Sequence, residues 1–472
     1  MNLELGLGLL MAVVFALGLF RPTTPDRRAG WVTFLGLIVL TGFSFTLTPG
    51  DTFFGGMFVV DALAIFAKRL FLVSAAISVL ATLGLPTSRF QSRGSEYHFA
   101  LLASLLGMLV LVSSRDLILL FVAFELMSMP LYFLTGFQKT EGSASEGALK
   151  FFLVGTVSSA VLLYGLSFVV GATGSTDVGA IVLAMASGNG LAKLGLVLAL
   201  AGFGFKIAAV PFHMWVPDTY EAASTPFVAW LSVAPKAAGF VVLFRLYLEG
   251  AGAVAIVWVP VLVALTGVTI VAGNLMAIPQ TNVKRMLAYS GIAHIGYMLM
   301  GLAAISAEGA GMVLFYLAAY LFGNMGAFLA VQAVGTAEGS DSMTAYKGLA
   351  QRSPVLAVSL LVFLLSLGGI PPVAGFWAKL FIFRAVIDQQ MYGLALLGAV
   401  ATIVALYYYL VLGARMYVEA PDNPAPVPVA RPLFFAILIC AIGTVVMGLW
   451  PEPLVRAALD AAGGLFQSAS LR

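Results

Sequence analysis

The segment 201-AGFGFKIAAVPFHMWVPDTYEAASTPFVAWLSVAPKAAGF-240 contains two apolar runs separated by a patch that holds prolines. Each run carries a lysine, Lys206 in the first and Lys236 in the second. A lysine near the centre of a bilayer costs about 2.5–3.5 kcal/mol on insertion scales, so two retained lysines indicate a function. Pro211 and Pro217 disrupt the helix between the runs. Broken backbone at membrane depth must be buried in protein or line a wet cavity, so this segment predicts an ion or proton route.

The composition of the 472-residue chain indicates an integral membrane protein. Hydrophobic residues make up 61% of it and charged residues 10%, and the mean hydropathy is +1.03, far from the values of a soluble domain. The net charge of +3 is small and spread along the chain, which argues against a nucleic-acid partner. The single cysteine, Cys440, cannot hold an iron–sulfur cluster or form an internal disulfide. We therefore expect no metal or redox centre in this chain.

The apolar segments predict an all-α polytopic membrane protein with about 14 transmembrane helices, at roughly 20 residues per span. The seventh and twelfth helices are expected to be broken, because prolines interrupt them. The first span follows Met1 with no basic segment or cleavage site, so we expect a retained helix and not a signal peptide. The predicted spans are 3–20, 31–48, 58–84, 98–114, 117–137, 148–170, 191–212, 224–248, 254–277, 282–304, 310–335, 354–386, 391–414 and 432–450.

The distribution of basic residues predicts the orientation in the membrane. Cytoplasmic loops carry an excess of Lys and Arg, so the odd-numbered loops are expected inside and both termini outside. The odd loops carry Arg21, Arg27, Arg28, Arg89, Arg93, Lys139, Lys284, Arg285, Lys347, Arg352, Arg415 and Arg431. The N-terminus, the even loops and the tail carry Arg115, Lys193, Arg384, Arg456 and Arg472.

A weak internal similarity predicts a repeat. The segment 130-PLYFLTG-136 resembles 295-IGYMLMG-301, at a spacing that equals five helices. An odd number of helices inverts the second copy, which places broken helices at corresponding positions; 211-PFHMWVP-217 and 368-GGIPPVAG-375 fit this expectation. The predicted organisation is 1–97 for helices 1–3, 98–248 for the first inverted repeat (helices 4–8), 254–414 for the second (helices 9–13), and 415–472 for a linker and helix 14.

Glu125 is the only acidic residue well inside a predicted span. A lone buried carboxylate needs a cationic partner, and Lys206 is the natural one; the alternative is that Glu125 only ties helices together. An ion pair would keep Lys206 protonated, and separating the pair would leave the cost of burial to favour proton release. We therefore expect a proton switch at this pair.

Further ionisable residues could extend the route. Lys236 lies about a dozen residues from either end of its helix and Lys379 follows the second break; the alternatives are a snorkelling Lys236 and a Lys379 near the outer surface. His213 and His294 could bridge the lysines as relay groups or be structural histidines. Lys206, Lys236 and Lys379 would then form a lateral chain of basic sites.

Three other basic residues have no assigned role. Lys68 and Arg69 lie in the third predicted helix without an adjacent acid, facing either a partner subunit or lipid headgroups. Lys150, at the start of the sixth predicted helix, either forms part of a proton entry route or anchors that helix at the membrane interface.

Four segments carry a resemblance to a known family. They are 205-FKIAAVPFHMWVPDTYEAASTPFVAWLSVAPKAAGF-240, 282-NVKRMLAYSGIAHIGYMLMGL-302, 368-GGIPPVAGFWAKLFIF-383 and 406-LYYYLVLGARMYVE-419. They resemble the antiporter-like subunit N family of the bacterial proton-pumping NADH–quinone oxidoreductase, respiratory complex I. The similarity covers roughly residues 100–420; the first three helices match only in hydropathy.

The resemblance implies a fold of fourteen helices with inverted five-helix repeats and a relay of Glu125, Lys206, Lys236 and Lys379. It implies proton translocation by a non-catalytic subunit, coupled to quinone reduction elsewhere in the complex, with quinone, flavin and iron–sulfur clusters in partner subunits. The implied partners are subunit M, small membrane subunits, the lateral helix of subunit L and the lipid bilayer of the bacterial inner membrane. The nearer alternative is a subunit of a multi-subunit cation/proton antiporter, and the more distant one is a stand-alone solute carrier or a membrane scaffold.

Overall fold

The computed structural model describes residues 1–472 except 21–26, 86–92, 139–141, 182–188, 251–254 and 471–472. Its elements in chain order are α1 (Asn2–Phe20), α2 (Arg28–Ser44), β1 (Asp51–Phe53), the 3₁₀ turn η1 (Phe54–Gly56), β2 (Phe58–Val60), α3 (Ala62–Thr82), α5 (Gly94–Ser113), α6 (Leu117–Thr135), α7 (Gly142–Thr173), α9 (Gly190–Ile207), α10 (Trp215–Ala222), α11 (Thr225–Leu231), α12 (Ala234–Leu243), the π-helical η2 (Phe244–Gly250), α13 (Ala255–Ala277), α14 (Val283–Ala303), α15 (Ala307–Glu338), the 3₁₀ turn η4 (Met343–Tyr346), α16 (Leu349–Arg352), α17 (Pro354–Gly368), α18 (Ala374–Asp388), α19 (Tyr392–Tyr417), α20 (Arg431–Leu449) and α21 (Glu452–Ser470).

The predicted class, an all-α polytopic membrane protein, is confirmed. Within the described residues, 12 helical stretches are long and apolar enough to cross a membrane, and α2 and α17 are shorter apolar helices. The second predicted span corresponds to α2, and the twelfth corresponds to α17 followed by α18. A helix can cross a bilayer because its backbone N–H and C=O groups form hydrogen bonds within the helix itself.

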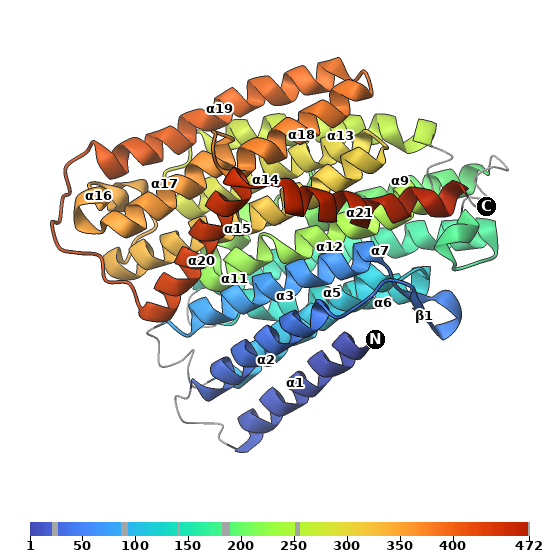
Figure 1. Ribbon diagram of the computed structural model, residues 1–472, viewed down its shortest axis with the longest axis horizontal. Coiled ribbons are helices and arrows are strands. Elements are labelled where there is room, and N and C mark those ends of the chain that lie inside the picture. The colour runs from blue at the N-terminus through green and yellow to red at the C-terminus, as the bar shows by residue number, and fades with distance from the viewer. Residues whose placement is uncertain (21–26, 86–92, 139–141, 182–188, 251–254, 471–472) are drawn as a thin grey trace.

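The long helices lie side by side, with α1 at one edge of the view and α19 at the opposite edge (Figure 1). In the described part of the chain, three isolated antiparallel β-bridges each join two loops that lie at the same end of the bundle, as expected for a chain that crosses back and forth. The residues joined are Phe58 with Ser114, Asp116 with Asp177, and Asn282 with Ser342.

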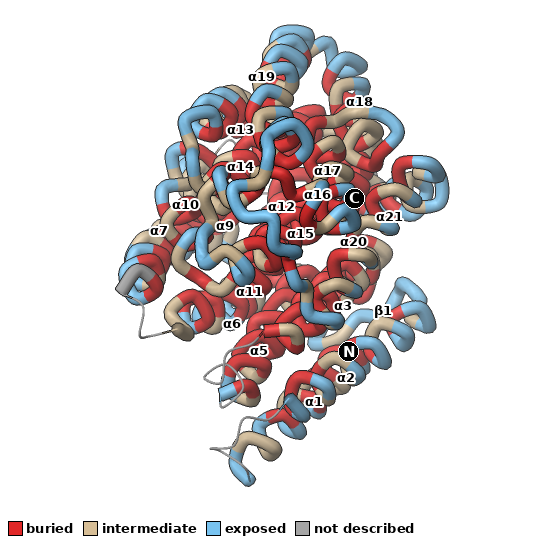
Figure 2. Tube along the Cα trace, turned by 90° about the vertical axis from the view of Figure 1, so that its left-hand side faces the viewer, coloured by how far each residue is buried: buried red, intermediate tan, exposed pale blue. Residues whose placement is uncertain are grey.

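Burial is concentrated in the middle of the bundle. The apolar window of the eighth span, 225–249, is 100% buried and that of α15 is 94% buried, against 28% for α1 and α13. Figure 2 shows the same contrast between the buried centre and the exposed outer helices. Charged groups on the central helices are therefore kept from lipid by surrounding protein.

Both predicted helix breaks are confirmed. The seventh span ends at Ile207 and resumes as α10 at Trp215, while the twelfth ends at Gly368 and resumes as α18 at Ala374. A left-handed residue closes each first half, Ala208 with φ 66° and Gly369 with φ 82°, the usual geometry of a helix C-terminus. The Val210–Pro211 and Pro371–Pro372 peptide bonds are cis. The inverted relation of the two repeats stays a prediction.

A third break was not predicted. The eighth span stops at Leu231 and restarts at Ala234. Pro235, in the first turn of α12, has no N–H to donate, so the helix is more easily interrupted just before it. The break matters because Lys236 lies directly after it.

The chain ends in a helix that the hydropathy pattern did not reveal. Helix α21 carries Glu452, Arg456 and Asp460 on an exposed side and buries Ala458 and Ala462. Its buried side packs along α15 and α3. Because charges interrupt its apolar residues, it has no long apolar run, and the prediction of one C-terminal helix after residue 415 missed it.

Candidate functional site

The first half of the site lies where α6, α7 and α9 meet. Lys206, 2% exposed, lies in the last turn of α9. Its Nζ donates a hydrogen bond to Ser128 Oγ on α6 at 2.8 Å and lies 5.3 Å from the centre of the Phe124 ring. The half-buried Glu125 instead accepts a hydrogen bond from Ser159 Oγ on α7 at 2.5 Å.

The expected direct ion pair between Glu125 and Lys206 is not formed. Among the described residues, no carboxylate oxygen lies within 4.0 Å of Lys206 Nζ, although the Glu125 charge still acts on Lys206 through space. The reason is geometric: Ser128 is three residues beyond Glu125 on α6, and the two side chains serve different neighbouring helices. Hydroxyl groups therefore hold the lysine and the carboxylate separately.

The backbone at the first break finds partners outside the broken helix. The Val210 N–H donates to Thr269 Oγ1 on α13 at 3.0 Å, and the Trp215 indole N–H donates to the Phe205 carbonyl at 3.2 Å. Buried polar groups left unpaired are costly. These bonds allow the helix to end beside Lys206.

Lys236 lies in the fully buried eighth span, directly after its break. It is 1% exposed, and none of the described residues accepts a hydrogen bond from its Nζ. The ammonium lies 5.5 Å from the centre of the Tyr220 ring. A Cβ on Gly291 of α14 would lie 3.4 Å from Nζ and 2.8 Å from the Tyr320 hydroxyl, so the missing side chain leaves room for both groups.

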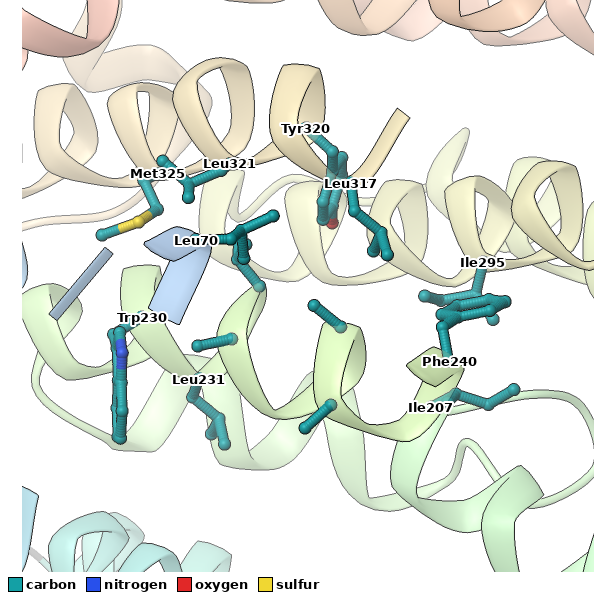
Figure 3. Packing of buried hydrophobic residues seen from close by; sticks show 14 of the residues in the cluster. Leu70, Ile207, Trp230, Leu231, Phe240, Ile295, Leu317, Tyr320, Leu321 and Met325 are labelled. Atoms are coloured by element: carbon teal, nitrogen blue, oxygen red, sulfur yellow. The ribbon is translucent and has the colours of Figure 1, made fainter. Parts of the chain in front are cut away.

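Other polar atoms beside Lys236 are also buried without a partner among the described residues. They are the hydroxyls of Tyr220 and Tyr320 and the Oδ1 atom of Asn324. Asn324 lies one turn from Tyr320 on α15 and donates to Ser232 Oγ, one turn from Lys236, at 2.7 Å. Figure 3 shows Tyr320 within the buried apolar layer that includes Ile295, Leu317 and Phe240.

His294, on α14, links the two halves of the site. Its ring lies 5.1 Å from the ring of Tyr320, on the Lys236 side, and 6.1 Å from the ring of Tyr297, which Lys379 approaches. Its Nδ1 lies 2.7 Å from the Tyr316 hydroxyl and its Nε2 lies 3.3 Å from the Tyr409 hydroxyl. The Tyr409 hydroxyl in turn shares a short hydrogen bond with Ser290 Oγ.

Lys379 completes the series after the second break. It is 4% exposed and donates from Nζ to the Gly368 carbonyl, the end of α17, at 3.2 Å. Its ammonium lies 4.8 Å from the centre of the Tyr297 ring. The break thus exposes a carbonyl that an intact helix would use for itself, and this carbonyl receives the lysine.

The structure places His213 differently from the other predicted groups. It lies half-buried in the first break, and no hydrogen bond or ion pair joins it to a lysine among the described residues. The hydroxyl partners Ser128, Ser159, Tyr316 and Tyr409 were not predicted, because hydroxyl residues are common in apolar helices and carry no charge to mark them.

The unassigned basic residues have carboxylate or carbonyl partners. Lys68 Nζ lies 2.7 Å from the carboxylate of Glu4, a buried acid at the start of α1. Arg69 donates to the Ser44 carbonyl at 3.1 Å. Lys150 lies 2.8 Å from carboxylate oxygens of both Glu146 and Asp218. Lys68 therefore faces neither lipid nor a partner subunit.

A separate charged cluster lies at the end of the eighth span. Arg245, fully buried in η2, donates to both carboxylate oxygens of Asp61 at 2.8 and 2.9 Å. Glu249 lies 3.4 Å from Arg245 and 2.5 Å from Arg115. These charges pair with one another and anchor η2 to the start of α3. Among the described residues, no group of three His, Cys, Asp or Glu side chains is placed to hold a metal ion.

Residues 114–405 match the family model described as "NADH:quinone oxidoreductase/Mrp antiporter, TM". A relative from Heliobacterium modesticaldum, NADH-quinone oxidoreductase subunit N, is 42% identical over 98% of this chain and 97% of its own. A chain of respiratory complex I from Thermus thermophilus superposes with a TM-score of 0.82 and 33% identity, covering 96% of this chain and 98% of that chain. A chain of the Mrp complex from Dietzia sp. DQ12-45-1b has a TM-score of 0.87 at 20% identity over 98% and 97% of the two chains, which shows a shared fold.

Proposed function

The chain belongs to the NADH-quinone oxidoreductase subunit N family, and we propose that it moves protons through the membrane along its buried lysines. The observation that carries this proposal is the series Lys206, Lys236, His294 and Lys379, buried on central helices beside two helix breaks. Ionisable residues inside a membrane protein are costly and mark ion or proton pathways.

The first step of the relay is a switch at Lys206. With Ser128 as its hydrogen-bond partner, Lys206 lies apart from Glu125. A shift of either side chain toward the other would form an ion pair that retains a proton on the lysine, and the return shift would favour its release. When the ion pair is separated, Ser128 accepts a hydrogen bond from Lys206 and Ser159 donates one to Glu125, so neither buried group is left without a partner.

The second step crosses from Lys236 to Lys379. The unpaired polar atoms around Lys236 call for bridging water, since buried polar groups in proteins are nearly always hydrogen-bonded. His294 hydrogen-bonds to the hydroxyls of Tyr316 and Tyr409. Its ring also lies 6.1 Å from the Tyr297 ring, which Lys379 Nζ approaches, so we place His294 between this group and Lys379, with water completing the path. We assign His213 a role at the first break and not between the lysines, because no hydrogen bond or ion pair of the described residues joins it to this series.

We propose that the subunit is non-catalytic in electron transfer and carries no cofactor of its own. A chain with one cysteine lacks the thiolates that an iron–sulfur cluster requires. Quinone, flavin and iron–sulfur clusters would then lie in partner subunits, and their redox energy would reach this chain as a change at Glu125 and Lys206.

The proposed setting is the inner membrane of a bacterium, with both termini on the outer side. The proposed neighbours are the antiporter-like subunit M, small membrane subunits and the lateral helix of subunit L. The exposed apolar residues of outer helices, such as Leu9 of α1 and Ile403 of α19, suit either lipid or neighbouring membrane helices.

The test begins with the assembly that co-purifies with this chain from native membranes. Reduction of quinone by that assembly, coupled to proton translocation that Lys206→Ala abolishes, is the expected result. A redox-silent assembly of membrane subunits that exchanges sodium for protons would contradict the proposal and favour the cation/proton antiporter. The Mrp similarity alone does not favour that alternative, because at 20% identity it extends only to the fold.

A further inference from the structure

The odd-loop end of the bundle carries basic residues that are paired with carboxylates. Lys284 lies 2.8 Å from Asp341 and Lys347 lies 3.0 Å from Asp422. Arg352 pairs with Glu338 and also donates to the Ala425 carbonyl at 2.9 Å. The fold has therefore supplied a counter-ion to each of these three cations.

Arg415, in the last turn of α19, differs from them. It is only partly exposed, and no carboxylate of the described residues lies within 4.0 Å of its guanidinium. Its own carbonyl accepts a hydrogen bond from the Gly348 N–H at 3.1 Å, which places it beside the paired cations. A partly buried guanidinium with no counter-ion favours an external anion.

Arg415 lines a pocket of about 330 Å³ whose walls include several residues with hydrogen-bond donors. Its walls come from the connection between α13 and α14, from the segment before and within η4, and from α19. The polar lining residues besides Arg415 are Gln280, Thr281, Ser342, Thr344, Tyr407 and Tyr408. Amide and hydroxyl groups around one guanidinium are the donors that commonly bind phosphate oxygens.

The pocket walls are fixed by backbone hydrogen bonds. The Met343 N–H donates to the Thr281 carbonyl at 2.8 Å, and the Val283 N–H donates to the Asp341 carbonyl at 2.9 Å. These bonds join the two loops that face Arg415. The loops that carry the polar side chains are thus fixed before any ligand binds, and Ser342 Oγ and Thr344 Oγ1 are held 3.0 Å apart by their own hydrogen bond. This order reduces the entropic cost of binding.

The surface next to the pocket is apolar. Leu275 and Ile278 of the α13 side are 55% and 39% exposed, and Leu410 of α19 is 51% exposed. Both helices are membrane-spanning candidates. We propose that the pocket binds the phosphate of an anionic phospholipid, with its headgroup against Arg415 and its acyl chains along α13 and α19.

Two sources could supply the same chemistry, a lipid headgroup or free phosphate. The apolar strip beside the pocket favours the lipid, since a free phosphate would gain nothing from it. The single unneutralised charge favours an anionic lipid over a zwitterionic one. This site lies outside the lysine series, so its test does not depend on the proposed proton path.

The experiment uses the intact complex, stripped of lipid in neutral detergent and titrated with phosphatidylglycerol, phosphatidylcholine or inorganic phosphate. Native mass spectrometry counts the bound lipids. Arg415→Gln is expected to weaken binding of one phosphatidylglycerol at least about tenfold, because a charge-assisted contact is lost. Arg431→Gln, an exposed arginine in the first turn of α20, is the matched control and is expected to bind as the unchanged protein does.

Arg415→Lys and Thr281→Val are milder changes that separate loss of lipid binding from misfolding. Quinone reduction by each variant shows that its complex is assembled. Arg415→Lys is expected to bind with intermediate affinity, since it keeps the charge and loses the guanidinium fork. Competition by inorganic phosphate at equal concentration would support the site and assign it to free phosphate. Equal binding of both lipids, or equal binding of phosphatidylglycerol to Arg415→Gln and Arg431→Gln, would overturn the proposal. Failure of the unchanged protein to bind phosphatidylglycerol would also overturn it, leaving a carboxylate of a neighbouring subunit as the counter-ion.

Discussion

The buried lysine ammonium groups of the proposed relay have three different sets of neighbours. Lys206 has a serine hydroxyl, Lys379 has a backbone carbonyl at a helix break, and Lys236 has no hydrogen-bond partner among the described residues. A hydroxyl or a carbonyl oxygen binds an ammonium group less strongly than a carboxylate does. The lysines are therefore placed to exchange protons more readily than the firmly paired Lys68.

Tyr409 provides a prediction at the scale of one hydroxyl. Tyr409→Phe removes the group that lies between His294 and Ser290, so proton movement through the subunit is expected to slow about tenfold or more. Tyr408→Phe is the control, because its hydroxyl donates to Asn274 Oδ1 and, among the described residues, makes no hydrogen bond to His294. Proton translocation per quinone reduced, measured in proteoliposomes, distinguishes the two, and equal values for both variants would rule out the role of Tyr409.

The sequence predicted ionisable residues better than it predicted their contacts. Lys206, Lys236 and Lys379 stand out because each is charged within an apolar run. The lysine partners are hydroxyl and backbone carbonyl groups, which carry no charge that distinguishes them in the sequence. A direct contact of Glu125 with Lys206 was therefore expected, and the hydrogen bonds of each to a separate serine were not. Glu4 was overlooked because it lies near the end of its helix.

At the scale of elements, each helix break has a proline beside it, although Pro130 and Pro260 lie inside unbroken helices. The prolines at 211 and 371–372 allowed both principal breaks to be predicted, because a missing donor and a clash with the preceding turn disfavour helix. The break before α12 was missed because Pro235 is also acceptable within the first turn of a helix. Helix α21 was missed because its apolar residues are spaced for one face and do not form a continuous run.

The close contact between the halves of the twelfth span supports a second prediction. A Cβ on Gly375 would collide with the Ser366 carbonyl, so Gly375→Ala is expected to destabilise the protein by about 1–3 kcal/mol. Gly393→Ala, where no atom lies within 4 Å of the added Cβ, is the control and is expected to be neutral or stabilising by up to about 1 kcal/mol. Thermal unfolding in detergent measures both; similar melting temperatures for the two variants would contradict this account of the break.

Helix α10 is attached to its neighbours by charges, which gives a dependence on pH. The carboxylate of Asp218 accepts hydrogen bonds from Lys150 Nζ at 2.8 Å and from Arg285 Nη1 at 2.9 Å. Burial alone would raise the pKa of Asp218, but these hydrogen bonds outweigh it and hold the pKa below its ordinary value. The stabilisation is thus present above the unfolded value of about 3.9 and is lost as the pH falls through the lowered folded value.

Asp218→Asn is therefore expected to reduce the free energy of unfolding by about 1 kcal/mol at pH 7, a modest value because the pair is partly exposed. The difference from the unchanged protein should shrink below about pH 4. Glu146→Gln, which removes a more exposed carboxylate bound only to Lys150, is expected to cost less. Melting temperatures that do not differ between Asp218→Asn and Glu146→Gln at pH 7 would count against the attachment.

At the scale of the whole molecule, the middle of the proposed relay lies in the most buried helices. The eighth span, α14 and α15 carry Lys236, His294, Tyr316 and Tyr320, while the outer helices expose apolar side chains. This arrangement follows from the cost of placing charge in lipid, which is avoided when other helices surround the charged ones. The apolar runs predicted about 14 spans; the described residues contain 12 helical stretches long and apolar enough to cross a membrane, and two shorter apolar helices. Only the assembled bundle shows that residues far apart in sequence converge on His294.

The most direct test of the central claim is the number of protons translocated per quinone reduced by the assembled complex carrying Lys236→Ala. The account predicts that this ratio falls, because the variant removes the central basic group while leaving the electron-transfer subunits unchanged. Arg456→Ala, which alters a cation that is 74% exposed on α21, is expected to keep the ratio of the unchanged protein. An undiminished ratio in Lys236→Ala would show that protons do not pass through the lysine series.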